Sequence, residues 1–238
     1  MNKITRKTFL FLATLAFAVL ASTAALAAAA NFQLFGDSVL TSPGYNSVTA
    51  AQIRSDGAIA PNYGGVDFVI PAGLTVNDLD NLSADYKFVA GSCGGGSPRF
   101  QVNVVTPSGT KNLFVYIGPP TSYTGCAQNT WANTNNLASG TNQVDATQLG
   151  GGFYMTYAAA QAAYGLYEIT GIQVVADGSW AVGGTQTVHV DNVKINTLTY
   201  SFETANSCKN DGWQQFLSAP GPFTNQGQCV SYFAKGGQ

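Results

Sequence analysis

The sequence has few of the side chains that most enzymes use for catalysis. Charged residues make up 9% of the chain, against about 25% in ordinary soluble proteins. It contains a single histidine, His189, and only two glutamates, Glu168 and Glu203. A Ser/His/Asp site needs a histidine base, and no GxSxG segment accompanies this one. Glycosidases need two converging carboxylates, and no paired-acid motif contains the glutamates. We therefore expect no catalytic residue.

The sequence also lacks a cluster of basic residues. Three of the ten basic residues lie in the first seven positions, whereas all twelve acidic residues lie after residue 30. The remaining chain of about 210 residues carries seven basic and twelve acidic residues, a formal net charge of −5. This balance disfavours a nucleic-acid partner or an anionic membrane surface. After the first 30 residues, no segment is apolar enough to span a membrane.

Residues 1–30 have the pattern of a secretory signal peptide. A positive head at Lys3, Arg6 and Lys7 precedes an apolar run, and an alanine tract ending at Ala30 supplies small residues at cleavage spacing. An uncleaved membrane anchor is the alternative, because 22 residues from Phe9 could span a bilayer. The pattern predicts a protein that is secreted or located at the cell surface or in the periplasm.

The four cysteines, Cys93, Cys126, Cys208 and Cys229, all follow the predicted signal peptide. An even number in an exported chain indicates two disulfides, for which three connectivities exist. We favour pairing between near neighbours, Cys93 with Cys126 and Cys208 with Cys229. A zinc site is the alternative, but CxxC spacing is absent.

The distribution of β-forming residues predicts an all-β fold. Short runs rich in Val, Ile, Tyr, Phe and Thr alternate with clusters of Gly, Pro, Asn and Ser. We expect a jelly-roll-like antiparallel β-sandwich over residues 31–204, with one or two short helices and a disulfide-pinned tail over 205–238. The expected strands are 32–35, 65–70, 86–90, 100–106, 112–117, 167–176, 185–195 and 198–203, and the expected helical segments are 75–82 and 156–164.

The strand at 185–195 contains a break in its alternation. Val188 and Val190 have one parity, whereas Val193 and Ile195 have the other. A regular strand cannot place all four on one face. The pattern therefore predicts a β-bulge near Asp191 and Asn192.

Aromatic and oxygen-bearing residues are the candidate ligand groups. Tyr and Trp rings, which carry a hydroxyl or an N–H group, are suited to stacking on a hydroxylated ligand such as a sugar. The alternative is that these rings pack in the hydrophobic core. We select Tyr123, Trp131, Trp180 and Trp213 as the candidate ligand-binding residues.

We expect no cofactor, and a structural calcium ion is the alternative. Asp191 and Asn192 at the predicted bulge, or the run 77–81 (NDLDN), could supply oxygen ligands, although turns and caps also explain them.

Two segments resemble a family of secreted bacterial proteins with no assigned activity. They are residues 93–100 (CGGGSPRF) followed by 115–119 (VYIGP), and the tail with 208–213 (CKNDGW) and 223–230 (FTNQGQCV). Asp211 stands where the tail pattern usually has Gly. The resemblance implies that Cys208 and Cys229 pair. Residues 188–196 also resemble a late strand of jelly-roll carbohydrate-binding modules.

These observations favour an exported, non-catalytic binding domain for a glycan or a cell-envelope component. A structural or adhesive surface protein that contacts other proteins is the second hypothesis, and a secreted hydrolase is the third.

Overall fold

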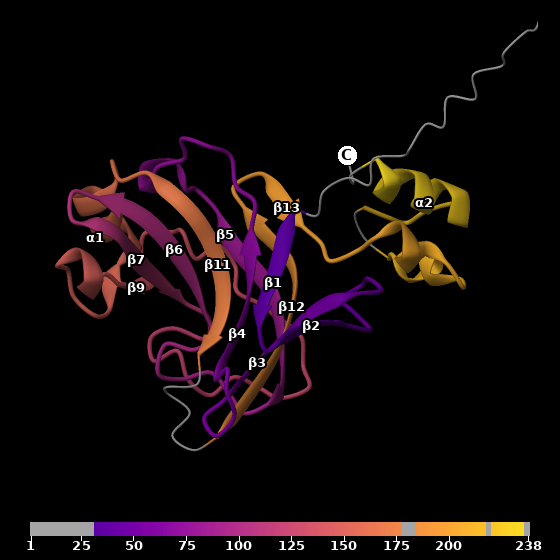
Figure 1. The fold of residues 1–238 in the computed structure, drawn as a ribbon, viewed down its shortest axis with the longest axis horizontal. Helices are drawn as coiled ribbons and strands as arrows, with labels where there is room; N and C mark the ends of the chain where they lie inside the picture. The colour runs from indigo at the N-terminus through magenta and orange to yellow at the C-terminus, as the bar shows by residue number, and fades with distance from the viewer. Residues whose placement is uncertain (1–30, 178–183, 218–219, 236–238) are drawn as a thin grey trace, which may run out of the picture.

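Two antiparallel sheets packed face to face form most of the protein in the computed structural model, which describes residues 31–177, 184–217 and 220–235 (Figure 1). Sheet A consists, in spatial order, of β1 (Phe32–Gly36), β4 (Tyr63–Phe68), β11 (Ile169–Asp177), β6 (Arg99–Thr106), β7 (Gly109–Tyr116), β9 (Gln143–Asp145) and β10 (Met155–Thr156). Sheet B consists of β2 (Ser38–Thr41), β3 (Ala50–Asp56), β12 (Thr185–Ile195), β5 (Leu82–Ala90) and β8 (Ala132–Asn133), and β13 (Leu198–Tyr200) pairs with β12. This arrangement confirms the predicted jelly-roll-like β-sandwich.

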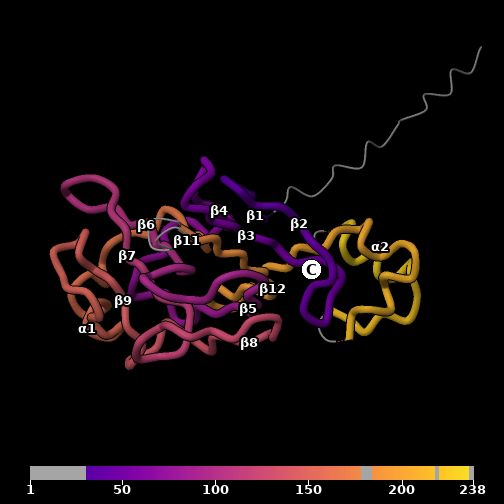
Figure 2. The backbone as a smooth tube through the Cα atoms, turned by 90° about the horizontal axis from the view of Figure 1, so that it is seen from below, coloured from indigo at the N-terminus to yellow at the C-terminus, as the bar shows by residue number. Residues whose placement is uncertain are grey.

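The hydrophobic core lies between the inner faces of the two sheets. Figure 2 shows β5 and β8 on the opposite side of the molecule from β1 and β4. In the central strands the inward-pointing residues are fully buried, as Val66 and Val174 are in sheet A and Ile53 and Phe88 are in sheet B. The residues between them therefore form two outer faces, one on each sheet.

The predicted bulge in β12 is confirmed. The pairing of β12 with β5 shifts register between Asp191 and Lys194, and Asn192 has φ 46°. Because the extra residue restores the alternation, Val188, Val190, Val193 and Ile195 are all buried.

Several strands are absent from the sequence-based prediction. The most important is β3, whose sequence AAQIRSD contains one β-branched residue. It lies between β2 and β12 and buries Ala51 and Ile53 against the core. Here packing between neighbouring strands outweighs the low β-propensity of alanine and aspartate.

Of the two predicted helical segments, 156–164 is an α-helix, whereas 75–82 contains only a three-residue 3-10 turn and ends in β5. The capping box of Thr75 and Asp78 begins a 3-10 turn, η1 (Val76–Asp78), and Thr156 caps α1 (Tyr157–Tyr164). The following Gly165 is not left-handed, because its φ is −55°. A Cβ there would lie 2.0 Å from the Asn77 Oδ1 atom, so close packing rather than a left-handed turn explains the glycine.

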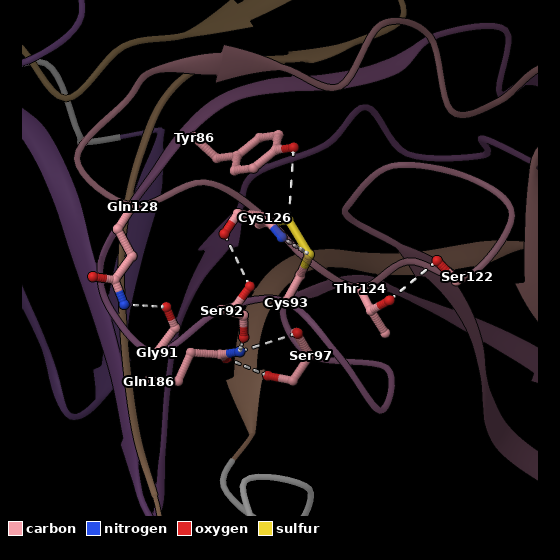
Figure 3. Close-up of a disulfide and its surroundings, with 10 residues drawn as sticks. All are labelled: Tyr86, Gly91, Ser92, Cys93, Ser97, Ser122, Thr124, Cys126, Gln128 and Gln186. Atoms are coloured by element: carbon pink, nitrogen blue, oxygen red, sulfur yellow. Dashed lines mark hydrogen bonds between the residues drawn. A yellow bond between two sulfur atoms is a disulfide. The ribbon is translucent and has the colours of Figure 1, made fainter.

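Both disulfides join near neighbours in the sequence, Cys93 to Cys126 and Cys208 to Cys229, as predicted. The Cys93–Cys126 bridge lies beside Gln186 of β12 (Figure 3). The Gln186 Nε2 group donates to the Ser92 and Ser97 carbonyl oxygens at 2.8 and 3.1 Å. The loop that carries Cys93 is thereby connected to sheet B.

Residues 205–235 form a C-terminal segment beside the sandwich, gold in Figure 1. It contains η3 (Ala205–Cys208), the 3-10 turn η4 (Gly212–Gln215) and α2 (Gln226–Ala234), a helix that the sequence-based prediction lacks. Its small core consists of Phe216, Phe223 and the Cys208–Cys229 disulfide. Val48, from the loop between β2 and β3, packs against this cluster. None of the helices among the described residues has the length and apolarity needed to cross a membrane.

Candidate functional site

The sequence-predicted aromatic residues do not come together. Trp131 is half-buried near sheet B, whereas Trp213 is half-buried against the core of the C-terminal segment. Tyr123 is 3% exposed. Its hydroxyl accepts a hydrogen bond from the Gln143 backbone N–H at 2.9 Å. Both the ring and the hydroxyl of Tyr123 therefore make contacts inside the protein. Tyr123 therefore offers no open face to a ligand. Trp180 lies outside the described residues.

The two residues expected at a calcium site bind other protein groups. Asp191 is fully buried, and its Oδ2 atom accepts hydrogen bonds from the Tyr45 N–H at 2.8 Å and the Ser47 hydroxyl at 2.6 Å. Burial raises the pKa of Asp191 to about 7. The Asn192 side chain donates to the Asp85 carboxylate at 2.9 Å. Within the described residues, no three His, Cys, Asp or Glu side chains gather in a way that could hold a metal ion.

The candidate catalytic groups are also separate. His189 makes a 3.2 Å hydrogen bond through Nε2 to the Gln52 Oε1 atom. Glu203 is buried near the C-terminal segment, where it accepts a hydrogen bond from the Thr49 N–H. Glu168 is exposed and lies opposite Thr75. The two glutamates thus occupy different surroundings.

The outer face of sheet A carries a row of polar side chains that the sequence analysis did not identify. Cα pairing aligns Gln33 of β1 with Asp67 of β4, Asp67 with Gln173 of β11, and Gln173 with Gln101 of β6. We call these four residues the amide row. Because each strand alternates, all four point away from the core. β6 and β11 curve together in Figure 1, so the row crosses a bent sheet.

Hydrogen bonds between neighbours order the amide row. The Gln101 Nε2 group donates to the Gln173 Oε1 atom at 3.0 Å and to the Asn103 Oδ1 atom at 3.2 Å. Partial burial raises the pKa of the Asp67 carboxyl, and a hydrogen bond from the Gln173 side chain opposes this shift. The amides of Gln101 and Gln173 are thereby held in position with hydrogen-bonding capacity left over, since an amide group has two donors and two acceptor lone pairs.

Aromatic rings border the amide row. Phe114 of β7 is the next residue across the sheet from Gln101, and the Arg99 guanidinium lies 4.5 Å from its ring. The ring of Phe35 lies over Gly65, where a Cβ atom would come within 2.3 Å of the Phe35 ring. Both rings are half-buried. Polar groups on the strands thus lie between apolar, flat surfaces.

A hollow of about 520 Å³ begins at the Gln33 end of the amide row. Its lining residues include the polar Gln33, Asp67 and Thr170 and the apolar Val69 and Ile70. Gly171 also lines it, and a Cβ atom at this position would lie 3.0 Å from the Asn103 Nδ2 atom. The volume lies within the range of small-molecule sites, and the lining contains both polar and apolar groups.

Solved structures that match the chain include two weak likenesses. Neither a family profile nor a curated protein sequence matches the chain. An exo-β-agarase structure is 14% identical with a TM-score of 0.29, and the match covers 71% of this chain and 23% of the agarase chain. A carbohydrate-binding module of the CBM28 type, specific for non-crystalline cellulose, is also 14% identical, with a TM-score of 0.25 and coverage of 66% and 79%. Likenesses of this size do not identify a relative.

Proposed function

We propose that the protein is an exported, non-catalytic binding domain that holds a neutral glycan on the amide row of sheet A. The observation that carries this proposal is the alignment of Gln33, Asp67, Gln173 and Gln101 across four adjacent strands, next to a hollow of about 520 Å³. Export is supported by the signal-peptide pattern and by two disulfides, which form in oxidising compartments.

The chemistry of the row suits sugar hydroxyl groups. Each hydroxyl is both a donor and an acceptor, and the side chains of Gln101 and Gln173 offer both functions. The neighbouring rings of Phe35 and Phe114 can contact the apolar C–H face of a pyranose. A linear glycan laid across the strands would meet one polar side chain at each strand.

The charges on this face favour a neutral ligand. Asp67 contributes a carboxylate within the row, and the nearby Arg99 is paired with Asp177 at 2.8 Å. An anionic sugar would therefore meet an acceptor-only group of like charge, which disfavours its binding.

Gln101 and Gln173 provide the test of this function. We expect the double substitution Gln101→Ala and Gln173→Ala to raise the Kd for the bound glycan about thirtyfold, because two hydrogen bonds of about 1 kcal/mol each are lost. The measurement is affinity electrophoresis in gels containing cellulose derivatives, xylan, mannan or agarose, with the chain from residue 31 onward.

The matched control is the substitution of Gln214 and Gln215 by alanine, because both are exposed in the C-terminal segment. This variant should migrate like the parent protein. Binding that the amide-row variant retains in full, or an absence of binding to all four neutral polysaccharides, would contradict the proposal.

Adhesion to another protein is the second candidate function. It is favoured by β2, an edge strand of sheet B that exposes Val39 and Leu40 to 50% and 43%. An exposed apolar edge can add a strand from a partner. Leu40→Lys should abolish such an association, measured by sedimentation over a range of concentrations, while leaving glycan binding intact.

A further inference from the structure

The outer face of sheet B has a second set of ligand-type side chains, independent of the amide row. Cα pairing places His189 of β12 between Gln52 of β3 and Lys87 of β5. All three have the parity that points away from the core, since Ile53, Phe88 and Val188 beside them are buried, but His189 itself is only 8% exposed and lies beneath this surface. Trp131, just before β8, adjoins Lys87 at the end of this line. Four segments distant in the sequence thus meet on one surface.

Two aromatic rings lie together on this surface. The Trp131 and Tyr45 ring centroids are 5.4 Å apart with an interplanar angle of 41°, and the Trp131 and His189 rings are 6.5 Å apart. Tyr45 is 37% exposed. The Lys87 Nζ atom lies 5.0 Å from the centre of the Trp131 ring. The surface therefore combines an indole, a phenol and an ammonium group.

The loop that carries Tyr45 is held firmly. Asp191 accepts hydrogen bonds from the Tyr45 N–H and the Ser47 hydroxyl, and Glu203 accepts one from the Thr49 N–H. At the far side of the loop, Val48 packs against the C-terminal segment. Tyr45 is thus positioned by contacts with both sheet B and the C-terminal segment, before any ligand arrives.

Lys87 supplies a positive charge on this surface. Within the described part of the chain, the ion pairs belong to Arg54 and Arg99, and Lys87 takes part in none of them. Both carboxylate oxygens of the nearby Asp85 accept hydrogen bonds from neutral amides, from Asn133 at 2.7 Å and from Asn192 at 2.9 Å. Burial and the charge of Lys87 both lower the pKa of His189, which favours the neutral imidazole. This contrasts with the amide row, where the charged residue is Asp67.

We propose that the surface formed by Tyr45, Trp131, Lys87, His189 and Gln52 binds an acidic sugar residue, a hexuronate within a polysaccharide. The indole and phenol rings contact the C–H face of the sugar, and the Lys87 ammonium pairs with its carboxylate. Gln52 lies next to His189 and can bind a ring hydroxyl. The protein would then carry two glycan sites of opposite charge preference, one on each sheet, and could connect a neutral polysaccharide to an acidic one.

Oligogalacturonate and oligomannuronate are the probes for this site, and calorimetry is the measurement. We expect Lys87→Gln and Trp131→Ala each to weaken binding at least tenfold. Reduction of the probe's carboxyl groups to alcohols should weaken binding to the parent protein by a similar factor. Because the ion pair is near the surface, affinity should fall as salt rises from 20 to 200 mM.

The control variant is Lys194→Gln, which removes the same charge from an exposed position elsewhere on β12. It should bind like the parent protein, as should the double alanine variant of Gln101 and Gln173. The proposal is overturned if neither uronate binds, if carboxyl reduction has no effect, or if Lys87→Gln matches the parent. Stronger binding of polyglutamate than of either uronate would assign the surface to an acidic protein instead. The sites lie on different sheets, so failure here leaves the amide row untouched.

Discussion

Replacing both Cys208 and Cys229 with serine is expected to unfold the C-terminal segment while the two sheets remain folded. Among the described residues of this segment, the buried hydrophobic cluster consists of the two cysteines, Phe216 and Phe223, with partly buried rings around them. A disulfide that closes a loop with a sequence separation of 21 contributes about 3 kcal/mol. So small a core cannot offset that loss.

Limited proteolysis with mass spectrometry measures this effect. Cleavage in the double serine variant should concentrate between residues 205 and 235, whereas the sandwich should resist as in the parent protein. The alanine variant of Gln214 and Gln215 is the control, because it alters the same segment without removing the bridge. A cleavage pattern equal to that of the parent protein would show that packing alone holds the segment.

The stability of the sandwich should fall as pH rises, because of Asp191. Its side chain is fully buried, and burial raises its pKa from 3.8 to about 7. A folded-state pKa above the unfolded value means that the folded protein binds the proton more tightly. The stabilisation is therefore complete below about pH 4 and is lost as pH rises to about 7. This single group can change the free energy of unfolding by up to about 4 kcal/mol.

Urea unfolding at pH 5, 6, 7 and 8 tests the prediction. The free energy of unfolding should decrease from pH 5 to pH 7 and level off toward pH 8 in the parent protein. It should vary less in Asp191→Asn, whose side chain has a similar shape but does not titrate. Burial also raises the pKa of Glu203, which contributes a change in the same direction. Equal pH slopes for the parent protein and Asp191→Asn would contradict the assignment.

The fold could be predicted from sequence where local pattern and packing agree. The parity break in β12 predicts the bulge correctly, since four valine and isoleucine residues require one buried face. The strand β3 could not be predicted in this way, because its alanines and polar residues become a strand only through pairing with β2 and β12.

The candidate sites could be predicted only in part. Trp131 stands out as an aromatic residue among polar neighbours, but its partners Tyr45, Lys87 and His189 become visible only through sheet register. The amide row gives no local signal, because each of its residues is one ordinary polar position in an alternating strand. Tyr123 is a candidate ligand residue from the sequence but is buried in the structure. A tyrosine ring and hydroxyl that could contact a ligand can equally pack in the interior and accept a buried hydrogen bond.

Side-chain amide resonances give the most direct test of glycan binding on sheet A. Nitrogen-15 NMR spectra would be recorded during titration with the hexasaccharides of cellulose, xylan, mannan and agarose. With at least one of these sugars, we predict shifts in the Nε2 amide signals of Gln33, Gln101 and Gln173, and unchanged signals in the backbone around Lys87. Unchanged amide signals with all four sugars, or shifts confined to another surface, would contradict the account.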